Sequence, residues 1–412
     1  MARRVTQSTR IAVVGAGPAG IMAALEASDL GAQAVLYDTN SQPGRKLLVT
    51  GNGRCNISHA GACAGDYVSD APDALAHILE RFGHRELVAR LKRLGVLTYT
   101  TSDGWCYPLS DSAATVVDAL WAALRISGVS LRLDTQVRDL VPRGSAWAII
   151  TGPSSTPEYY DRVIVATGGK AHPALGSTGR FFSCLESLGH RILPVHPALV
   201  SIEADMRKLQ RLQGVRMDAR LTLLADGRVL GQSTGNLLFT RSGLSGPAAM
   251  NVSYLVHQES GAALTAEIDL LALHDGALAR LLRDKRQSPW PLATLLGAVL
   301  PAKMPPELLR WSGLPPSCLL NELNQAQLDR VLASARALTL RVTGTRDLTF
   351  AQLSTGGVPL AEVDSPRMES RVAPGLHLAG EVLNVTGPCG GYNLLFAQAS
   401  GVLAGRGACA AT

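Results

Sequence analysis

The stretch IAVVGAGPAG, residues 11–20, decides the fold of this 412-residue chain. Its apolar run is typical of a β-strand, and it breaks into glycines before IMAALEASDL, which favours a helix. Gly15 permits a tight turn, Gly17 lets the backbone approach a pyrophosphate, and Gly20 allows the helix to pack closely on the strand. The phosphates would then lie at the positive N-terminus of the helix. The stretch therefore predicts an α/β unit that binds a dinucleotide.

The next apolar run supports this interpretation. AVLYD ends at Asp38, about twenty residues beyond the glycines, where an acidic side chain can accept hydrogen bonds from a ribose. A G-x-G-x-x-G pattern alone can arise by chance in a chain with 41 glycines. The strand, the helix and Asp38 in the expected order argue against chance.

Composition limits the class of protein. Lys and Arg number 39 against 33 Asp and Glu, which gives a net charge of +6, compatible with an anionic cofactor, an anionic substrate or nucleic acid. The seven cysteines are scattered without a C-x-x-C pair, so we expect no disulfide framework, no metal and a cytoplasmic protein. No apolar run approaches the roughly eighteen residues that span a bilayer, and no membrane partner is expected.

The pattern along the chain predicts a divided cofactor domain. An α/β pattern covers residues 1–194 and returns over residues 347–412. Between them, residues 195–346 are expected to be an insert. Its first part, residues 195–270, shows short alternating segments with an Asp-Gly turn at residues 226–227 and is expected to be β-rich. The second part, residues 271–346, is Leu-rich, interrupted by prolines and expected to be helical.

Two further segments of the first part have a clear pattern. Apolar residues at spacings of three and four predict a pair of helices over residues 71–94, broken near Gly83. The run VSLRLDTQVRDLV, residues 129–141, is expected to form a strand.

A second candidate cofactor segment is GRKLLVTGNGRCN, residues 44–56. It places Arg45, Lys46 and Arg54 among glycines that allow close approach to a phosphate or a ring. The alternative is a solvated basic loop. A third candidate is VIVATGG, residues 163–169, a buried strand that ends in small residues, as expected where a sheet passes under a dinucleotide.

The fourth segment is LHLAGEVLNVTGPCGGYNLLFAQASG, residues 376–401. A strand ends near Glu381, whose carboxylate can hold the sugar-like polyol of a flavin. The run from Gly390 to Asn393 then opens a helix whose free N–H groups can face the carbonyl-bearing edge of the flavin, which favours the reduced, anionic form. The alternative is a plain strand, turn and helix that closes the sheet.

These segments supply the expected cofactor contacts. They are Gly15, Gly17, Pro18, Ala19, Gly20, Asp38, Arg45, Lys46, Gly51, Asn52, Arg54, Cys55, Asn56, Val137, Ala166, Thr167, Gly168, Gly169, Gly380, Glu381, Asn384, Gly387, Gly390, Gly391, Tyr392 and Asn393.

The chain resembles a known family. GAGPAG, GRKLLVTGNGRCN, ATGGKAHPALGSTG, LLFTRSGLSGP, STGGV and AGEVLNVTGPCGGYN occur in this order, as in the BaiN-type NAD(P)/FAD-dependent flavoproteins, also labelled aminoacetone-oxidase-like. The resemblance implies a Rossmann-like FAD domain of the two-dinucleotide-binding type, interrupted by an insert with a β-barrel and a small helical subdomain. Members of the family have been linked to reduction of conjugated double bonds in bile-acid intermediates. Others have been linked to reduction of a ribosomal RNA uridine to dihydrouridine.

The chain departs from the family pattern at two positions. Asn384 stands where the family usually has Asp; it can hydrogen-bond a ribityl hydroxyl or the flavin edge, but it cannot act as a base. Arg180 stands where the family usually has an acidic residue, in a loop expected to border the active site, and it favours an anionic substrate. Arg241 is the second candidate for recognising a phosphate or carboxylate.

The proton donor is harder to identify than the cofactor contacts. Cys55 lies in the expected flavin loop and can protonate a substrate carbon, but a small packed thiol fits the same position. His172 and Tyr392 are the other candidate catalytic residues. A lone histidine is more often structural.

The sequence therefore predicts an oxidoreductase with non-covalent FAD. Because only one complete G-x-G-x-x-G is present, NAD(P)H is expected to bind transiently as electron donor. Three functions are compatible with the sequence. The preferred one is reduction of an enone-like bond, in a ribosomal RNA uridine or a small molecule; the others are a small-molecule amine oxidase that releases peroxide and a non-enzymatic flavin-bearing redox or interaction protein.

Overall fold

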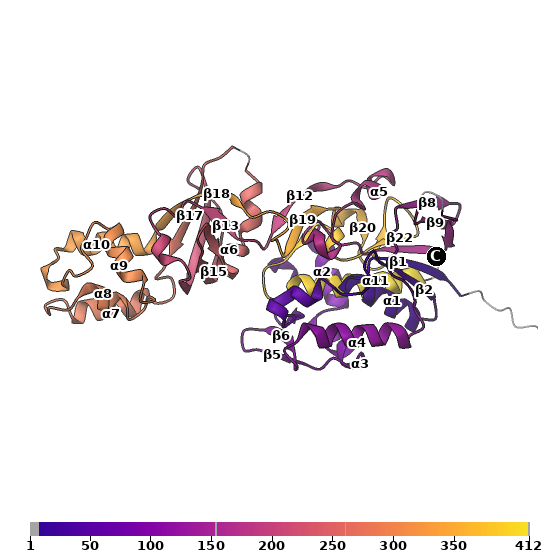
Figure 1. Ribbon diagram of the computed structural model, residues 1–412, viewed down its shortest axis with the longest axis horizontal. Helices are drawn as coiled ribbons and strands as arrows, with labels where there is room; N and C mark the ends of the chain where they lie inside the picture. Colours follow the sequence, from indigo (N-terminus) through magenta and orange to yellow (C-terminus); the bar gives the residue numbers. More distant parts are fainter. Residues whose placement is uncertain (1–7, 153–154, 260, 411–412) are drawn as a thin grey trace, which may run out of the picture. The chain divides into compact units, whose positions relative to one another are not determined.

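A computed structural model describes residues 8–152, 155–259 and 261–410 (Figure 1). The chain divides into two compact units, residues 1–196 with 348–412 and residues 197–347. The boundaries expected after residues 194 and 346 thus fall after residues 196 and 347. Each unit has its own cluster of buried apolar side chains.

The first unit is built on a seven-stranded sheet with the order β20-β21-β22-β11-β1-β2-β7. The five strands from β22 to β7 pair in parallel, and the sheet continues beyond β22 with β21 and β20, which each pair antiparallel with the strand before. Their bounds are β1 Arg10–Val14, β2 Gln33–Tyr37, β7 Ser130–Arg132, β11 Arg162–Val165, β20 Val363–Asp364, β21 Glu369–Ser370 and β22 Leu376–Leu378. Apolar runs such as IAVV suit strands that are covered on both faces.

Two helices pack closely on each other beside this sheet, α1 (Pro18–Asp29) and α11 (Tyr392–Cys409). A Cβ at Gly401 would lie 2.2 Å from the Ala19 carbonyl oxygen, so glycine is required for the two helices to approach this closely. The helix pair expected over residues 71–94 is confirmed as α2 (Pro72–Arg81) and α3 (His84–Arg93).

Smaller sheets complete the first unit. They have the orders β3-β6-β5, β10-β9-β8, β4-β23 and β12-β19. The bounds of these strands and the remaining helices are β3 Ser58–His59, β4 Val68–Ser69, β5 Thr98–Thr100, β6 Trp105–Pro108, α4 Ala113–Ile126, β8 Asp139–Arg143, β9 Ala146–Ile150, β10 Glu158–Tyr160, α5 Phe182–Ser187, β12 Leu193–Ala198, β19 Leu353–Gly357 and β23 Val385–Thr386.

The strand expected over residues 129–141 is wrong, because β7 ends at Arg132 and β8 begins at Asp139. Between them Asp134 adopts a φ of 50°. The backbone N–H groups of Asp134 and Thr135 donate to the carbonyls of Asn40 and Asp38, so this segment leaves the sheet to pair with a neighbouring loop.

The second unit contains a closed barrel with the order β13-β16-β15-β14-β17-β18. The turn predicted at Asp226 and Gly227 is confirmed, with φ values of 49° and 81°, between β14 and β15. The strands are β13 Ile202–Ala204, β14 Arg216–Ala225, β15 Arg228–Phe239, β16 Gly243–Ser245, β17 Leu264–Asp269 and β18 Leu338–Thr345. A short helix, α6 (Pro247–Met250), packs against β15.

In the sequence, the helical part of this unit lies between β17 and β18, and in Figure 1 its helices are seen to the left of the barrel. It contains α7 Asp275–Asp284, α8 Leu292–Leu296, α9 Met304–Trp311 and α10 Gln325–Arg336. The barrel therefore does not end near residue 270, and the helical part does not extend to residue 346 as expected. β18 closes the barrel after the helices, because its buried and exposed residues alternate as a barrel strand requires.

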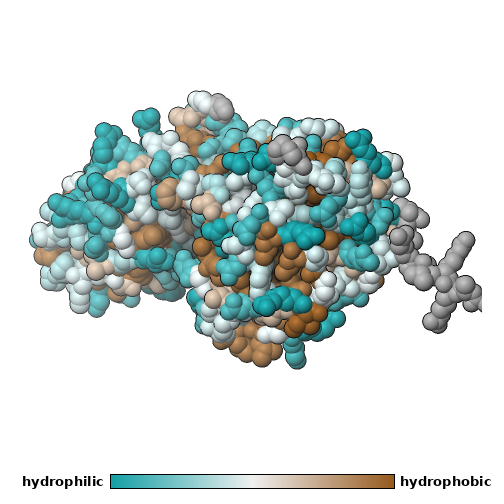
Figure 2. Space-filling view, turned by 45° about the vertical axis from the view of Figure 1, so that its right-hand side comes forward, coloured by the Kyte–Doolittle hydropathy of each residue, from teal (hydrophilic) through white to brown (hydrophobic). Residues whose placement is uncertain are grey.

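Hydrophilic residues cover much of the face seen in Figure 2, with smaller hydrophobic groups between them. Within the described residues, no helix combines the length and apolar character needed to cross a membrane. The same residues contain no cluster of three or more His, Cys, Asp or Glu side chains suited to a metal ion.

Candidate cofactor site

The predicted cofactor segments follow the carboxyl ends of four adjacent parallel strands. Gly15 follows β1, Asp38 follows β2, Ala166 follows β11 and Ala379 follows β22. The ends are level in the sheet, because Val14 pairs with both Tyr37 and Val165. In open α/β sheets, ligands bind in the crevice outside these ends.

The three fingerprint glycines have different surroundings. Gly15 has a φ of 104°, and a Cβ there would lie 2.4 Å from the Ala166 carbonyl oxygen. A Cβ at Gly20 would lie 1.8 Å from the Gly15 carbonyl oxygen. At Gly17, by contrast, no atom of the described residues beyond its neighbours in the chain lies within 4 Å of the Cβ position. The protein's own packing explains Gly15 and Gly20, and the open space at Gly17 fits a pyrophosphate at the N-terminus of α1.

Asp38 orders the loop around this opening. One carboxylate oxygen accepts from the Ala16 N–H at 2.6 Å, and the other accepts from the backbone and side-chain N–H groups of Asn40, both at 2.8 Å. Arg45 donates to the Asn40 side-chain oxygen at 2.5 Å. The remaining lone pairs of Asp38 are available to a ribose. Sequence reasoning missed Asn40, although an Asp side chain commonly accepts from the backbone N–H two residues further on.

A mostly buried ion pair joins the second and fourth segments. Lys46 Nζ lies 2.6 Å from Glu381 Oε2, and the two side chains are 22% and 13% exposed. Ser354 donates to Glu381 Oε1 through its N–H and its hydroxyl, both at 2.9 Å, and its hydroxyl accepts from the Lys170 N–H at 3.0 Å. The charge of Lys46 is therefore paired within the protein. Ser354, in the STGGV motif, was not among the predicted site residues.

Arg54 turns away from the loop that contains it. Its guanidinium donates to Asp111 at 2.8 Å and to the Tyr99 hydroxyl at 2.9 Å, and its Cζ lies 4.3 Å from the ring centroid of Tyr107. The guanidinium of Arg54 thus has partners within the protein, as the ammonium group of Lys46 has.

Cys55 is fully buried. Burial raises the pKa of its thiol to about 11, so the thiol stays protonated at neutral pH. The neighbouring Asn56 amide donates to the carbonyls of Ser58 and Cys106 at 3.1 and 3.2 Å. These contacts fix the chain beyond the loop against β3 and β6.

The start of α11 is rigidly held. Gly390 and Gly391 have φ values of 117° and 95°, and a Cβ at Gly391 would lie 2.4 Å from the Ser58 carbonyl oxygen. Asn393 accepts from the Gly387 N–H and donates to its carbonyl, both at 2.8 Å. The N-cap residue of this helix, Gly391, has no side chain that could cap it. The first N–H groups of a helix have no partner within the helix, so those of α11 can face a ligand such as the carbonyl-bearing edge of a flavin.

Tyr392, the first residue of α11, is half-buried. Its ring stacks on His59 with centroids 4.5 Å apart, and Tyr67 donates to its backbone carbonyl at 2.8 Å. Burial raises the pKa of Tyr392, so its hydroxyl keeps its proton at neutral pH.

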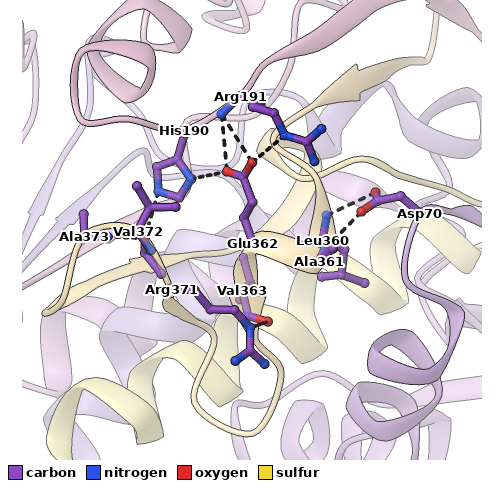
Figure 3. Close-up of polar contacts among 11 residues, drawn as sticks. Asp70, His190, Arg191, Leu360, Ala361, Glu362, Val363, Arg371, Val372 and Ala373 are labelled. Atoms are coloured by element: carbon purple, nitrogen blue, oxygen red, sulfur yellow. Dashed lines mark hydrogen bonds and ion pairs between the residues drawn. The ribbon is translucent and has the colours of Figure 1, made fainter.

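Asn384 uses both ends of its amide within the protein. Its oxygen accepts from the Gly356 N–H at 3.2 Å, and its nitrogen donates to Asp70 at 2.9 Å. Asp70 also accepts from the N–H groups of Leu360 and Ala361 (Figure 3). An Asp in place of Asn384 would set two carboxylates against each other, which gives a physical reason for the departure from the family pattern.

The remaining predicted residues lie in several places. His172 has a φ of 56° after the third segment, and burial followed by the nearby Lys46 charge lowers its pKa, so it is neutral at neutral pH. Val137 is buried between β7 and β8, whereas Arg180 is exposed just before α5. A Cβ at Gly169, beside Thr167 and Gly168, would lie 2.0 Å from the Ser354 hydroxyl. Arg241 is exposed between β15 and β16, in the second unit.

Comparison with known proteins places this geometry in a family. The HI0933-like protein Rossmann domain matches residues 9–407. The chain is 34% identical over 406 residues to the 3-dehydro-bile acid delta(4,6)-reductase of Clostridium scindens, covering 97% of this chain and 98% of the relative. It is 29% identical over 394 residues to the ribosomal RNA dihydrouridine synthase of Escherichia coli, covering 94% and 95%.

A solved structure supports the same fold. The 3-ketosteroid-delta4-(5alpha)-dehydrogenase of Rhodococcus jostii RHA1 matches with a TM-score of 0.53 at 15% identity, over 100% of this chain and 99% of that one. At this identity the likeness concerns the fold alone. The family match, the two full-length relatives and the strand-end site agree with the resemblance found in the sequence. The chain therefore belongs to the HI0933-like Rossmann family, the BaiN-type flavoproteins, and is an FAD-dependent oxidoreductase.

Proposed function

We propose that this protein uses FAD and NAD(P)H to reduce a carbon–carbon double bond conjugated to a carbonyl group. The observation that carries the proposal is the full-length similarity to two relatives whose names describe this bond type. One name describes reduction of double bonds in a 3-dehydro bile acid, and the other describes formation of dihydrouridine. In both cases the reduced bond is conjugated to a carbonyl.

Bound FAD supplies the hydride chemistry, and the chain's own residues bind and orient it. The opening at Gly17 and the N-terminus of α1 would hold the pyrophosphate. The start of α11 would hold the carbonyl-bearing edge, while the Lys46–Glu381 pair and Ser354 would keep the segments between them in place. These roles are supported by the positions of the segments at the strand ends.

The proton that completes the reduction is assigned to Tyr392. Cys55 is fully buried, and His172 is neutral at neutral pH, so neither is a strong candidate acid. Tyr392 is half-buried and keeps its proton. With one G-x-G-x-x-G in the sequence, NAD(P)H is expected to reduce the flavin and leave before the substrate binds, which gives ping-pong kinetics.

Our preferred substrate is a uridine of ribosomal RNA. The net charge of +6 favours a polyanion, and Arg180 and Arg241 are exposed and form no ion pair within the described residues. A steroid-like small molecule is the second candidate. It is supported by the identity of this chain to the bile-acid reductase, 34%, which is higher than its identity to the ribosomal RNA enzyme, 29%.

Anaerobic rapid mixing tests the proposal. NADPH or NADH should bleach the flavin absorbance rapidly, and the reduced protein should then be re-oxidised by a ribosomal RNA transcript that gains dihydrouridine. A transcript already containing dihydrouridine at the target position is the matched control and should leave the flavin reduced. Re-oxidation by a 3-oxo-Δ4 steroid alone would support the second candidate.

Other outcomes contradict the proposal. A flavin that is bleached by amines but not by NAD(P)H, with peroxide released in air, would indicate an amine oxidase. A flavin that reacts with none of these would indicate a non-enzymatic role.

A further inference from the structure

The strand β6 contacts two of the expected flavin segments. Trp105 and Tyr107 lie two residues apart on one face of β6, with ring centroids 6.4 Å apart and planes at 29°. A Cβ at Gly51 would lie 3.8 Å from Tyr107, and a Cβ at Gly390 would lie 3.3 Å from Trp105. One strand therefore packs against both the loop of the second segment and the start of α11.

Arg54 joins that loop to the same small sheet. Its Nη2 donates to Asp111 Oδ1 at 2.8 Å and to Tyr99 Oη at 2.9 Å, and Tyr99 Oη donates to Asp111 Oδ1 at 2.8 Å. The three groups form a closed triangle, and the guanidinium also lies over Tyr107. Hydrogen bonds from Arg54 and Tyr99 hold the pKa of Asp111 below its usual range.

The loop has a backbone that needs such support. Gly51, Asn52 and Cys55 have φ values of 56°, 54° and 60°. Left-handed conformations are unfavourable for residues other than glycine and persist only where the surroundings fix them. Arg54 stands between the two non-glycine residues, so its anchored side chain restrains this part of the loop.

We propose that Arg54 is a positioning residue. Arg54, Asp111, Tyr99 and Tyr107 form a clamp that fixes residues 51–55 against β6, and β6 in turn sets the spacing between this loop and the start of α11. The clamp thereby shapes the flavin environment without touching the cofactor. This inference rests on flavin binding by the two segments and not on the identity of the substrate. The competing interpretation is direct contact of Arg54 with the cofactor.

The chain offers a closely matched control. In the second unit, Arg336 donates to Asp275 Oδ1 through Nη2 at 2.8 Å and Nε at 3.2 Å, the same distances as in the Arg54 pair. The side chains are 45% and 47% exposed there, against 47% and 50% for Arg54 and Asp111. An exposed ion pair of this kind, outside a network, contributes little to stability.

The test compares Arg54→Lys, Asp111→Asn and Tyr99→Phe with Arg336→Lys and Asp275→Asn. The circular dichroism of the bound flavin and the dissociation constant of FAD are measured without substrate. All three clamp variants should change the flavin signal and weaken FAD binding, and turnover should fall by up to about a hundredfold through misplacement. Arg54→Lys combined with Asp111→Asn should be no worse than the poorer single variant, because the two residues act together.

Two results would overturn the inference. A large effect of Arg54→Lys with none from Asp111→Asn or Tyr99→Phe would show direct contact. Clamp variants that behave like the Arg336 and Asp275 controls would show an ordinary surface pair. If Arg54→Lys does not fold, the effect of Tyr99→Phe on the flavin signal and on FAD binding decides whether the clamp exists, since this change removes a single hydroxyl. The circular dichroism of the flavin and the dissociation constant of FAD need no substrate, so these two measurements are independent of the proposed reaction.

Discussion

At the scale of single residues, Gly17 differs from its two neighbours in the fingerprint. The Cβ position at Gly17 is open, whereas the Cβ position at Gly20 lies 1.8 Å from a carbonyl oxygen. Gly17→Val should therefore leave the fold intact and abolish FAD binding, because its side chain fills the space expected for the pyrophosphate. FAD content after purification and far-ultraviolet circular dichroism measure the two effects.

The matched change is Gly20→Val, which should prevent folding rather than only cofactor binding. Flavin retained by a folded Gly17→Val protein would contradict the assignment of this opening to the pyrophosphate.

Variants of Cys55 and Tyr392 distinguish a residue that only packs from one that donates the proton. Because Cys55 is fully buried, Cys55→Ala should keep its turnover and lose about 1 kcal/mol of stability. Tyr392→Phe should retain FAD and its reduction by NAD(P)H, yet lose turnover by about a hundredfold, as expected for a general acid. Single-turnover kinetics measure the change in turnover, and thermal unfolding measures the change in stability. If Cys55→Ala instead shows the hundredfold loss with its flavin retained, the donor is Cys55.

The sequence predicts backbone constraints better than side-chain partners. Gly15 and Gly20 are needed for a tight turn and for close packing of the helix on the strand. The G-x-G-x-x-G motif predicts both needs directly. The partners of Lys46 and Arg54 lie at Glu381 and Asp111, far along the chain. Nothing in the basic loop itself shows that these cations are already paired.

At the scale of elements, a polar cluster holds the short helix η7 (Leu360–Glu362) in the first unit (Figure 3). Glu362 accepts from His190 Nδ1 at 2.7 Å and from Arg191 Nε at 3.0 Å, and Ser370 Oγ lies 2.9 Å from His190 Nε2. Burial opposes ionisation of Glu362, but these hydrogen bonds outweigh it and lower the pKa of its carboxyl.

Glu362→Gln should lower stability by about 1–3 kcal/mol at neutral pH, because a charged hydrogen-bond acceptor is lost. A depressed pKa contributes stability that is present above the usual value of 4.5 and is lost as the pH falls through the folded-state value. The difference between wild type and variant should therefore shrink in acid.

Denaturant unfolding at several pH values measures this difference. Glu80→Gln, at an exposed position of α2, is the control and should show little difference at any pH. A Glu362→Gln difference that stays constant into acid would show that the carboxylate charge has no part in it.

Elements with a strong local signal were predictable. The helix pair α2 and α3 and the β14–β15 turn have clear periodicity or turn residues. The strand expected over residues 129–141 failed because Asp134 turns the chain toward the loop at residues 38–40, a long-range pairing that alternation cannot show. β18 was assigned to the helical part because its barrel partners, β13 and β17, precede the helices in the sequence.

At the scale of the whole molecule, the first unit is discontinuous in sequence. β11 pairs with β22, and α1 packs on α11, so residues 1–194 alone lack three strands of the sheet, β20, β21 and β22, and the helix α11 beside it. This fragment should not hold FAD. A chain in which residues 197–347 are replaced by a short Gly-Ser linker should hold FAD, because β12 and β19 are hydrogen-bonded neighbours where the insert leaves and returns.

Fluorescence titration with FAD of the fragment 1–194 and of the linker chain tests this prediction. Tight binding by residues 1–194, or loss of binding from a folded linker chain, would contradict the division of the unit. The split itself was predictable, since the α/β pattern stops and resumes in the sequence. The insertion of the helices between two barrel strands in the sequence was not predictable, since closure of the barrel depends on pairing between distant strands.

The central claim is that the four strand-end segments hold a non-covalent FAD. Acid precipitation of the protein, purified without added cofactor, tests this claim most directly, with the flavin in the supernatant identified by chromatography and compared with the amount of chain. We expect a yellow supernatant that contains FAD in an amount approaching that of the chain. A colourless protein that takes up no added FAD, or a flavin that stays with the precipitate, would contradict it.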